Sequence, residues 1–268
     1  MSQPELINET RLRREGGIAI LTIHNEARRN ALSPTVRETL NRYLNELMGD
    51  KSCRAIILTG AGGTFCAGAD VSGMKKREGT VDFLGRRHSV VNTGTSATTR
   101  IIATGPKPVV MAVEGAAVGA GLSLALAGEY TVAATNLKMC AAQILRGLCP
   151  DGGLYYVLTS RCGPGRAREI MLSGRVFGAV EAERYAIVHE VVEPGKTLEA
   201  AMAAAERFAS VPPLAFALTK AAMLNSYHTL EACFRAEQDF QPVVGLSKDH
   251  KESVSAFLEK RKPVFTGE

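Results

Sequence analysis

Two glycine-rich segments have the residue types and spacing most suited to chemistry. The first covers residues 62–70 (GGTFCAGAD) and the second residues 113–121 (VEGAAVGAG), and each follows an apolar run typical of a buried strand. Glycine allows positive φ and lets a ligand approach the main chain. Amides at a helix N-terminus point outward without a partner, with the positive end of the helix dipole behind them. If the two segments face each other, they would place two N–H donors on one oxygen, which is an oxyanion hole.

Neither segment predicts a nucleotide site. The second segment lacks the third glycine of a dinucleotide fingerprint after Gly119 and Gly121, and neither segment contains the Gly-Lys-Ser or Gly-Lys-Thr of a phosphate-binding loop. A plainer interpretation is two tight turns with close helix packing. The residues alone leave both interpretations open.

Alternating strands and helices would position these segments. Residues 10–15 and 18–24 flank Gly16-Gly17 as a β-hairpin, and Ser33-Pro34 begins a helix as its N-cap and first residue. Further strands are expected at 54–59, 108–113, 130–134 and 137–141, and further helices at 82–103 and from Gly115 onwards. This repeated pattern of two strands and a helix indicates an α/β fold.

Helical patterns dominate after Pro150, where only residues 187–192 resemble a strand. The expected helices are 153–159, 165–172, 180–185, 198–209, 213–224, 230–240 and 248–260. We therefore predict an α/β core over residues 1–195 and a helical C-terminal region over residues 196–268. No low-complexity linker separates them, so the helical region should pack on the core or on a neighbouring chain.

Composition is that of a soluble globular protein, with 46% apolar and 22% charged residues among 268. The net charge of +5 could attract polyanions. The basic residues form short scattered pairs, however, so a solvated surface is expected rather than a nucleic-acid site. The apolar stretch 109–127 is interrupted by Glu114 and glycines, which argues against a membrane span.

The six cysteines show no C-x-x-C spacing, and no two histidines have ligand spacing, so a metal site is not expected. The N-terminal residues contain no apolar signal segment. We interpret the cysteines as buried free thiols in a reducing compartment, and we expect a cytoplasmic location.

The order of short motifs resembles the crotonase superfamily, the enoyl-CoA hydratase/isomerase family. Phe65–Asp70 (FCAGAD) precedes Gly115–Gly121 (GAAVGAG) by the spacing of that family's signature. Arg28–Leu32 (RRNAL) resembles its early basic-Asn-Ala-Leu motif. The later landmarks are Ser173-Gly174, Val191-Val192 and the Phe257–Pro263 segment (FLEKRKP). The match runs in order over almost the whole chain.

This resemblance implies a crotonase-type spiral of ββα units with a C-terminal helical region that makes trimers, often paired into hexamers. It implies an acyl-CoA thioester as substrate, with no other cofactor, and an oxyanion hole from the backbone N–H groups of Ala69 and Ala120. The residues implied to contact coenzyme A are Arg28, Ala67, Asp70, Val71 and, from the C-terminal helix toward a neighbouring subunit, Phe257 and Lys260. A lysine there suits the nucleotide phosphates as a point charge.

The chain departs from the family's hydratases at two positions. Those hydratases use two glutamates, of which one activates water and the other handles the α-proton. At the corresponding places this chain has Ser123 and Gln143, and neither can act as a carboxylate acid or base. An ordinary two-glutamate hydration is therefore not expected. We interpret both side chains as contacts to the substrate.

One carboxylate lies nearby, at Asp151 in the sequence Cys-Pro-Asp-Gly-Gly over residues 149–153. Some isomerases of the family resemble the chain here. A single carboxylate can remove a proton α or γ to a thioester and return it elsewhere, provided that the enolate is held. Pro-Asp-Gly is also a good turn, and aspartate could cap a helix that begins near Gly153. The two roles are compatible.

Three functional hypotheses follow. The first is enoyl-CoA isomerisation with Asp151 as the proton shuttle. The second is an enoyl-CoA hydratase or other lyase with atypical acid and base residues. The third is a non-catalytic CoA-ester binder or an RNA-binding member, which ranks last because no aromatic stacking motif or dense basic stripe is present.

Overall fold

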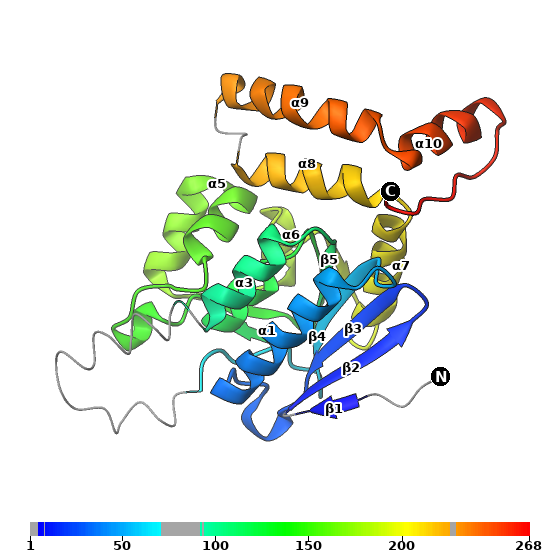
Figure 1. Cartoon of the computed structure of the whole chain (residues 1–268). Coiled ribbons are helices and arrows are strands. Elements are labelled where there is room, and N and C mark those ends of the chain that lie inside the picture. Colours follow the sequence, from blue (N-terminus) through cyan, green and yellow to red (C-terminus); the bar gives the residue numbers. More distant parts are fainter. Residues whose placement is uncertain (1–4, 8, 71–91, 93, 226–228) are drawn as a thin grey trace.

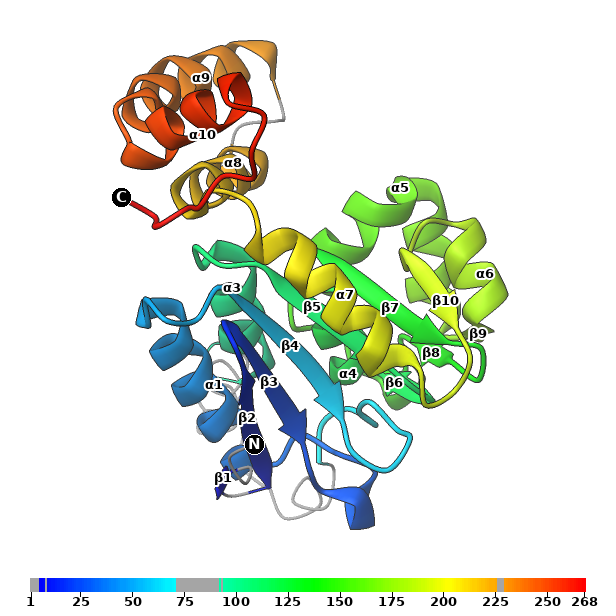
Figure 2. The same ribbon diagram turned by 90° about the vertical axis from the view of Figure 1, so that its right-hand side faces the viewer.

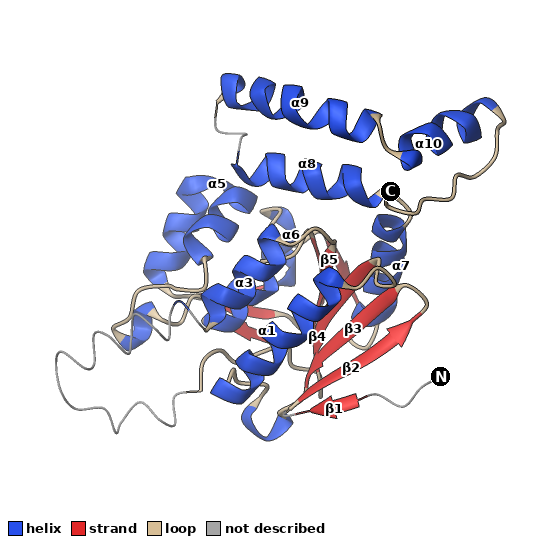
Figure 3. Cartoon of the chain, viewed as in Figure 1, coloured by secondary structure: helices blue, strands red, loops and turns tan. Residues whose placement is uncertain are grey.

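A seven-stranded sheet forms the centre of the fold in the computed structural model, which describes residues 5–7, 9–70, 92, 94–225 and 229–268 (Figures 1 and 3). Its strands are β1 (Glu5–Ile7), β2 (Thr10–Glu15), β3 (Ile18–Ile23), β4 (Ala55–Gly60), β5 (Val109–Val113), β7 (Tyr130–Ala134) and β10 (Glu190–Val192), and their order is β1-β2-β3-β4-β5-β7-β10. The predicted hairpin at Gly16-Gly17 is confirmed, because β2 and β3 pair antiparallel on either side of it. From β3 to β10 all neighbours are parallel.

Both faces of this sheet are buried, as expected of parallel strands. Side chains alternate between the faces along each strand. In β4, for example, Ile56 and Leu58 face one apolar cluster, and Ala55 and Ile57 face the other. The second cluster is covered by helix α7 (Thr197–Ala209), which lies across the sheet in Figure 2.

A three-stranded sheet of β6 (Ala116–Val118), β8 (Lys138–Cys140) and β9 (Val176–Gly178) lies beside the main one. β6 corrects the prediction of a helix from Gly115 onwards, because the helix, α4 (Ala120–Ala125), starts only after this strand. The reason is backbone pairing: the Cys66 N–H donates to the Ala116 carbonyl at 2.9 Å, and the Val118 N–H donates to the Cys66 carbonyl at 3.0 Å. Small residues allow these main chains to meet.

Helices α1 (Pro34–Gly49) and α3 (Thr95–Thr104) cover the other face of the sheet. The predicted start of α1 is confirmed, since the Ser33 hydroxyl accepts from the Val36 N–H at 3.1 Å and Pro34 is the first helical residue. Half of the helix predicted over 82–103, namely residues 82–91 and 93, lies outside the described residues, and α3 accounts for its end.

Helix α5 (Leu154–Ser173) joins two helices predicted separately. Gly163, with φ of 73°, breaks its helical geometry immediately before Pro164, as proline inside a helix requires. Helix α6 (Ala179–Arg184) and β10 follow. Strand β9, which lies between α5 and α6, was not expected, because three residues are too few to show alternation.

Three further helices complete the chain: α8 (Pro213–Asn225), α9 (Leu230–Gly245) and α10 (Lys248–Leu258). They form a layer on one side of the core (Figures 1 and 2). Lys220 fastens α8 to the core, because its Nζ donates to the Ile102 and Lys107 carbonyls at 2.7 and 3.0 Å and pairs with Glu129 at 2.8 Å. The boundary near residue 195 and the oligomerisation of this layer stay predictions.

The described cysteines are free thiols, but the prediction that all six are buried is wrong. Cys53, Cys66 and Cys140 are buried in the core, whereas Cys149 is exposed and Cys162 and Cys233 are partly exposed. Cys149 lies in the surface turn before α5, where no second layer covers it. Among the described helices, none combines the length and apolar character needed to cross a membrane.

Candidate functional site

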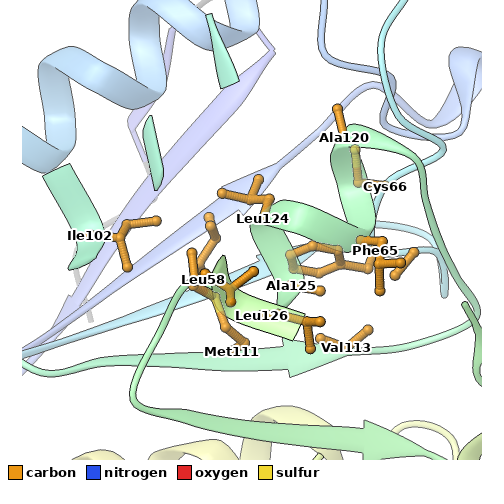
Figure 4. Close-up of a cluster of buried hydrophobic side chains, with 14 of the residues drawn as sticks. Leu58, Phe65, Cys66, Ile102, Met111, Val113, Ala120, Leu124, Ala125 and Leu126 are labelled. Atoms are coloured by element: carbon orange, nitrogen blue, oxygen red, sulfur yellow. The ribbon is translucent and has the colours of Figure 1, made fainter. Parts of the chain in front are cut away.

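The two glycine-rich segments lie against each other at one end of the apolar cluster shown in Figure 4, where Cys66 and Ala120 lie close together. Gly68 is the tightest point of this contact. A Cβ added there would lie 2.6 Å from the Val118 carbonyl oxygen and 3.6 Å from the Ala120 nitrogen. Only glycine fits such an approach, and its φ of +99° is likewise one that other residues rarely adopt.

The N–H of Ala69 points away from the segment around Leu32, with which Ala69 pairs. Ala69 forms a parallel bridge with Leu32, in which the Leu32 N–H donates to the Gly68 carbonyl at 2.8 Å and the Asp70 N–H donates to the Leu32 carbonyl at 3.5 Å. In a parallel pair, the central residue points its own N–H to the opposite side. Ala69 is partly exposed on that side.

Ala120 is the first residue of α4, so its N–H has no partner within the helix. Gly119, before it, turns with a φ of 56° and donates to the Cys140 carbonyl at 2.8 Å. In the described part of the chain, neither Ala69 nor Ala120 donates its N–H to a backbone carbonyl. Two unpaired donors on adjoining segments can hold one anionic oxygen.

Asn30 holds the first glycine-rich segment in place through hydrogen bonds. Its side-chain amide donates to the Ala61 and Thr64 carbonyls at 2.9 and 2.6 Å, and its Oδ1 accepts from the Asn25 N–H at 2.9 Å. Asn30 is fully buried with a φ of 56°, a conformation that asparagine tolerates. The sequence singled out Asn30 only as part of the basic-Asn-Ala-Leu motif and gave it no role, although the asparagine of that motif was the available signal.

The residues from the first half of the chain that are expected to contact coenzyme A lie near Asn30. Arg28 and Asp70 form an ion pair at 2.5 Å, with Arg28 mostly exposed, and the Ala67 N–H donates to the Arg29 carbonyl at 3.0 Å. Val71 lies outside the described residues. The structure thus brings Arg28, Ala67 and Asp70 close together beside the first glycine-rich segment. Their contact with coenzyme A stays a prediction.

Cys66, in the first segment, is not a nucleophile candidate. Burial raises the pKa of its thiol to about 12, against a smaller opposing effect of the Gly68 N–H, which donates to its sulfur at 3.4 Å. A thiol that stays protonated is a poor nucleophile and behaves as a small apolar side chain.

Asp151 is held by Ser123 and Gln143, the two residues expected at the positions of the hydratase glutamates. The fully buried Ser123 hydroxyl donates to the Asp151 carbonyl oxygen at 2.7 Å. The Gln143 Nε2 donates to the Asp151 carboxylate at 3.1 Å. The sequence analysis interpreted Ser123 and Gln143 as substrate contacts; the structure brings both to Asp151, and their contact with substrate stays a prediction.

The turn predicted at Asp151 is confirmed, but the alternative role of Asp151 as a helix cap is wrong. Gly152 and Gly153 have φ of 66° and 78°, and Gly153 itself is the N-cap of α5, without a side-chain cap. Gly152 packs tightly, since an added Cβ would lie 2.9 Å from the Cβ of Ser123. The Asp151 carboxylate therefore turns toward Gln143 rather than toward the helix.

Phe257 and Lys260 lie at the far end of the molecule. Figures 1 and 2 place α10 opposite the loop that carries residues 61–70. Phe257 is 83% exposed, and Lys260 follows the end of the helix with an exposed side chain. The structure does not bring them to the site of the same chain, and their expected contact in a neighbouring subunit stays a prediction.

A cavity of about 770 Å³ lies between the core and α8, away from the two glycine-rich segments. Its lining includes the buried pair of Glu129 and Lys220. Burial raises the pKa of Glu129, opposed by Lys220, and burial lowers the pKa of Lys220, opposed by Glu129. Glu129 also accepts from the Val109 N–H at 2.8 Å, so its role is structural. Metal-binding clusters of three or more His, Cys, Asp or Glu are absent from the described residues.

Comparison with known proteins decides the family. A sequence model described as enoyl-CoA hydratase/isomerase matches residues 13–268. The chain belongs to the enoyl-CoA hydratase/isomerase family. A 1,2-epoxyphenylacetyl-CoA isomerase of Escherichia coli K12 is 34% identical over 257 residues, covering 94% of this chain and 96% of that protein.

Other members of the enoyl-CoA hydratase/isomerase family are equally complete matches. A probable enoyl-CoA hydratase of Rhizobium meliloti is 32% identical over 270 residues and covers 99% of both chains. The crystal structure of an enoyl-CoA hydratase from Bacillus anthracis superposes with a TM-score of 0.90 at 30% identity, covering 97% of this chain and all of that one. The crotonase fold expected from the motifs is thereby confirmed, and the chain is an enzyme of this family.

Proposed function

We propose that this enzyme moves a double bond within an enoyl-CoA thioester, by single-carboxylate proton transfer at Asp151 above an oxyanion hole of Ala69 and Ala120. The single observation that carries the proposal is the set of partners around Asp151: Gln143 donates to its carboxylate and Ser123 donates to its main-chain carbonyl, at the two positions where the resemblance implies the glutamates of hydration. Of Ser123, Gln143 and Asp151, Asp151 is the one that carries a carboxylate.

The proposed reaction conserves the atoms of the substrate. The Asp151 carboxylate removes a proton α or γ to the thioester carbonyl, the C–H electron pair moves into a thioester enolate, and the two N–H groups hold the negative oxygen. The same carboxyl, whose proton can exchange with solvent in the meantime, then gives a proton to the other carbon, and the enolate collapses. No water is added, which agrees with the absence of a second carboxylate at Ser123 or Gln143.

The test is Asp151→Asn with Asp239→Asn as its matched control. Asp239 is exposed on α9, so the control removes the same charge away from the site. We expect Asp151→Asn to lose at least about 100-fold in kcat, since a positioned general base contributes on this scale. Binding of a non-reactive acyl-CoA, measured by calorimetry, should stay within a few-fold of wild type. Undiminished turnover in Asp151→Asn would contradict the proposal.

Hydration is the second candidate, because several similar proteins are named enoyl-CoA hydratases. In this chain it would need a water held without a carboxylate at Ser123 or Gln143. The two candidates differ in the mass of the product, since hydration adds one water and isomerisation adds none.

Coenzyme A binding and assembly belong to the same proposal. We expect Arg28, Ala67, Asp70 and Val71 to contact coenzyme A, with Phe257 and Lys260 supplied to a neighbouring subunit of a trimer or hexamer. The exposure of Phe257 and the separation of α10 from the oxyanion segments support this arrangement. A cytoplasmic location is likewise expected.

A further inference from the structure

The side chain of Gln143 bridges the oxyanion segment and the carboxylate. On one side, Gly119 leaves room for it: an added Cβ at Gly119 would lie 3.7 Å from both Cδ and Oε1 of Gln143. On the other side, Nε2 donates to Oδ1 of Asp151 at 3.1 Å. The backbone of Gln143 is fixed as well, because its carbonyl accepts from the Arg146 and Leu148 N–H groups at 2.9 and 3.0 Å.

The remaining polar atom of this amide is unsatisfied. Gln143 Oε1 is buried and has no hydrogen-bond partner. An unpaired buried acceptor is destabilising, and native proteins contain few of them. The side-chain amide of Gln143 therefore leaves Oε1 without a hydrogen bond while Nε2 donates to Asp151.

The chemistry of a carboxyl group determines which atom of this amide can face Asp151. An ionised carboxylate can only accept hydrogen bonds, so an Oε1 turned toward it would bring two acceptors together. A protonated carboxyl has an O–H to donate, and Oε1 can accept it. The terminal torsion of glutamine is broad and roughly two-fold, so one half-turn of the amide exchanges the two atoms.

We propose that Gln143 is the positioning residue that holds Asp151 in both protonation states of the transfer. It donates to the carboxylate before the proton is taken, and after a half-turn it accepts from the carboxyl that carries the proton. No bond in Gln143 is made or broken. A glutamate at this position would repel the ionised carboxylate, and an apolar residue could hold neither state. The inference rests on the proposed function of Asp151. It gives Gln143 the role of holding the catalytic carboxyl of Asp151 rather than that of contacting the substrate.

The first test is Gln143→Met, which keeps an unbranched side chain of similar length and removes both hydrogen-bonding atoms. Its matched control is Gln238→Met on α9, where Gln238 is exposed. We expect kcat to fall about 10- to 100-fold in Gln143→Met, as for a misplaced catalytic group, with KM and acyl-CoA binding nearly unchanged. The control should match wild type in both constants.

The second test is Gln143→Glu, which keeps the shape and removes the donor wherever the introduced carboxyl is ionised. Two carboxyls about 3 Å apart share one proton, so the introduced group can donate to Asp151 only as the pH falls. We expect turnover of this variant to be low at neutral pH and to recover toward more acidic pH, whereas wild type shows no such recovery. A residue with only a structural role would not change the pH profile in this way.

The outcomes separate the inference from the proposed function. If wild type neither shifts the double bond of an enoyl-CoA nor exchanges a substrate proton with solvent, the proposed function fails before any variant is compared. If wild type exchanges and Gln143→Met exchanges equally fast, the positioning role is overturned while Asp151 remains the base. A rise in KM with unchanged kcat would also overturn it, because Gln143 would then bind substrate directly.

Discussion

Replacing Gly68 by alanine tests whether the two glycine-rich segments must touch for the enzyme to work. The new Cβ would lie 2.6 Å from the Val118 carbonyl oxygen, and contacts under 3.0 Å are essentially never seen, so the segments must separate by at least about 0.4 Å. That movement displaces the Ala120 N–H from Ala69. Since a misplacement of about 1 Å can cost roughly 100-fold in rate, we expect kcat to fall about 10- to 100-fold. This equals about 1.4–2.7 kcal/mol of transition-state stabilisation.

Gly63→Ala is the matched control for this substitution. Gly63 also has positive φ, of 69°, but an added Cβ there meets nothing within 4 Å. Both variants should lose about 1–3 kcal/mol of unfolding free energy from backbone strain, measured by denaturant titration. Only Gly68→Ala should lose kcat, measured with an enoyl-CoA under saturating conditions. Wild-type kcat in a folded Gly68→Ala variant would refute the oxyanion geometry.

Two further predictions concern stability. Burial, and then Arg161, lowers the pKa of His189 from 6.5 to about 4, so the unfolded chain takes up a proton between these values and the folded chain does not. The contribution of His189 to stability is therefore complete above about pH 6.5 and is lost as the pH falls toward 4. After discounting for its exposure, we expect this contribution to be about 1 kcal/mol of unfolding free energy. In denaturant unfolding, His189→Gln should therefore show a weaker loss of stability at acidic pH than wild type. An unchanged dependence would contradict this. Lys220→Met leaves Glu129 buried without its cation and should cost about 3 kcal/mol of unfolding free energy, partly restored by adding Glu129→Gln; equal stability of all variants would exclude the pair as an anchor of α8.

The sequence predicts the main sheet well, because its signal is local and repeated. Ile18–Ile23 and Ala55–Gly60 are continuous apolar runs bounded by glycine, and buried parallel strands have this pattern. Short strands such as Ala116–Val118 and Val176–Gly178 are set by long-range pairing, which no window of three residues reveals. For the same reason, the helix expected from Gly115 begins later.

The candidate site was predictable in its residues and less so in their contacts. Ala69 and Ala120 were assigned from the resemblance and Asp151 as the nearby carboxylate, and their catalytic roles stay predictions. That Ser123 and Gln143 hold Asp151 could not be foreseen, because side-chain partners 8 and 28 residues apart depend on the turns between them. The helix-cap alternative for Asp151 failed because Gly153 occupies the cap itself.

Product analysis in deuterated water tests the central claim most directly. A trans-2-enoyl-CoA is incubated with the wild-type enzyme in deuterated water, and the product is examined by mass spectrometry and NMR. The account predicts a shifted double bond and deuterium at the α or γ carbon, with no water added, and loss of both changes in Asp151→Asn. Addition of one water by the wild-type enzyme would contradict it, because Ser123 and Gln143 would then support hydration without their glutamates.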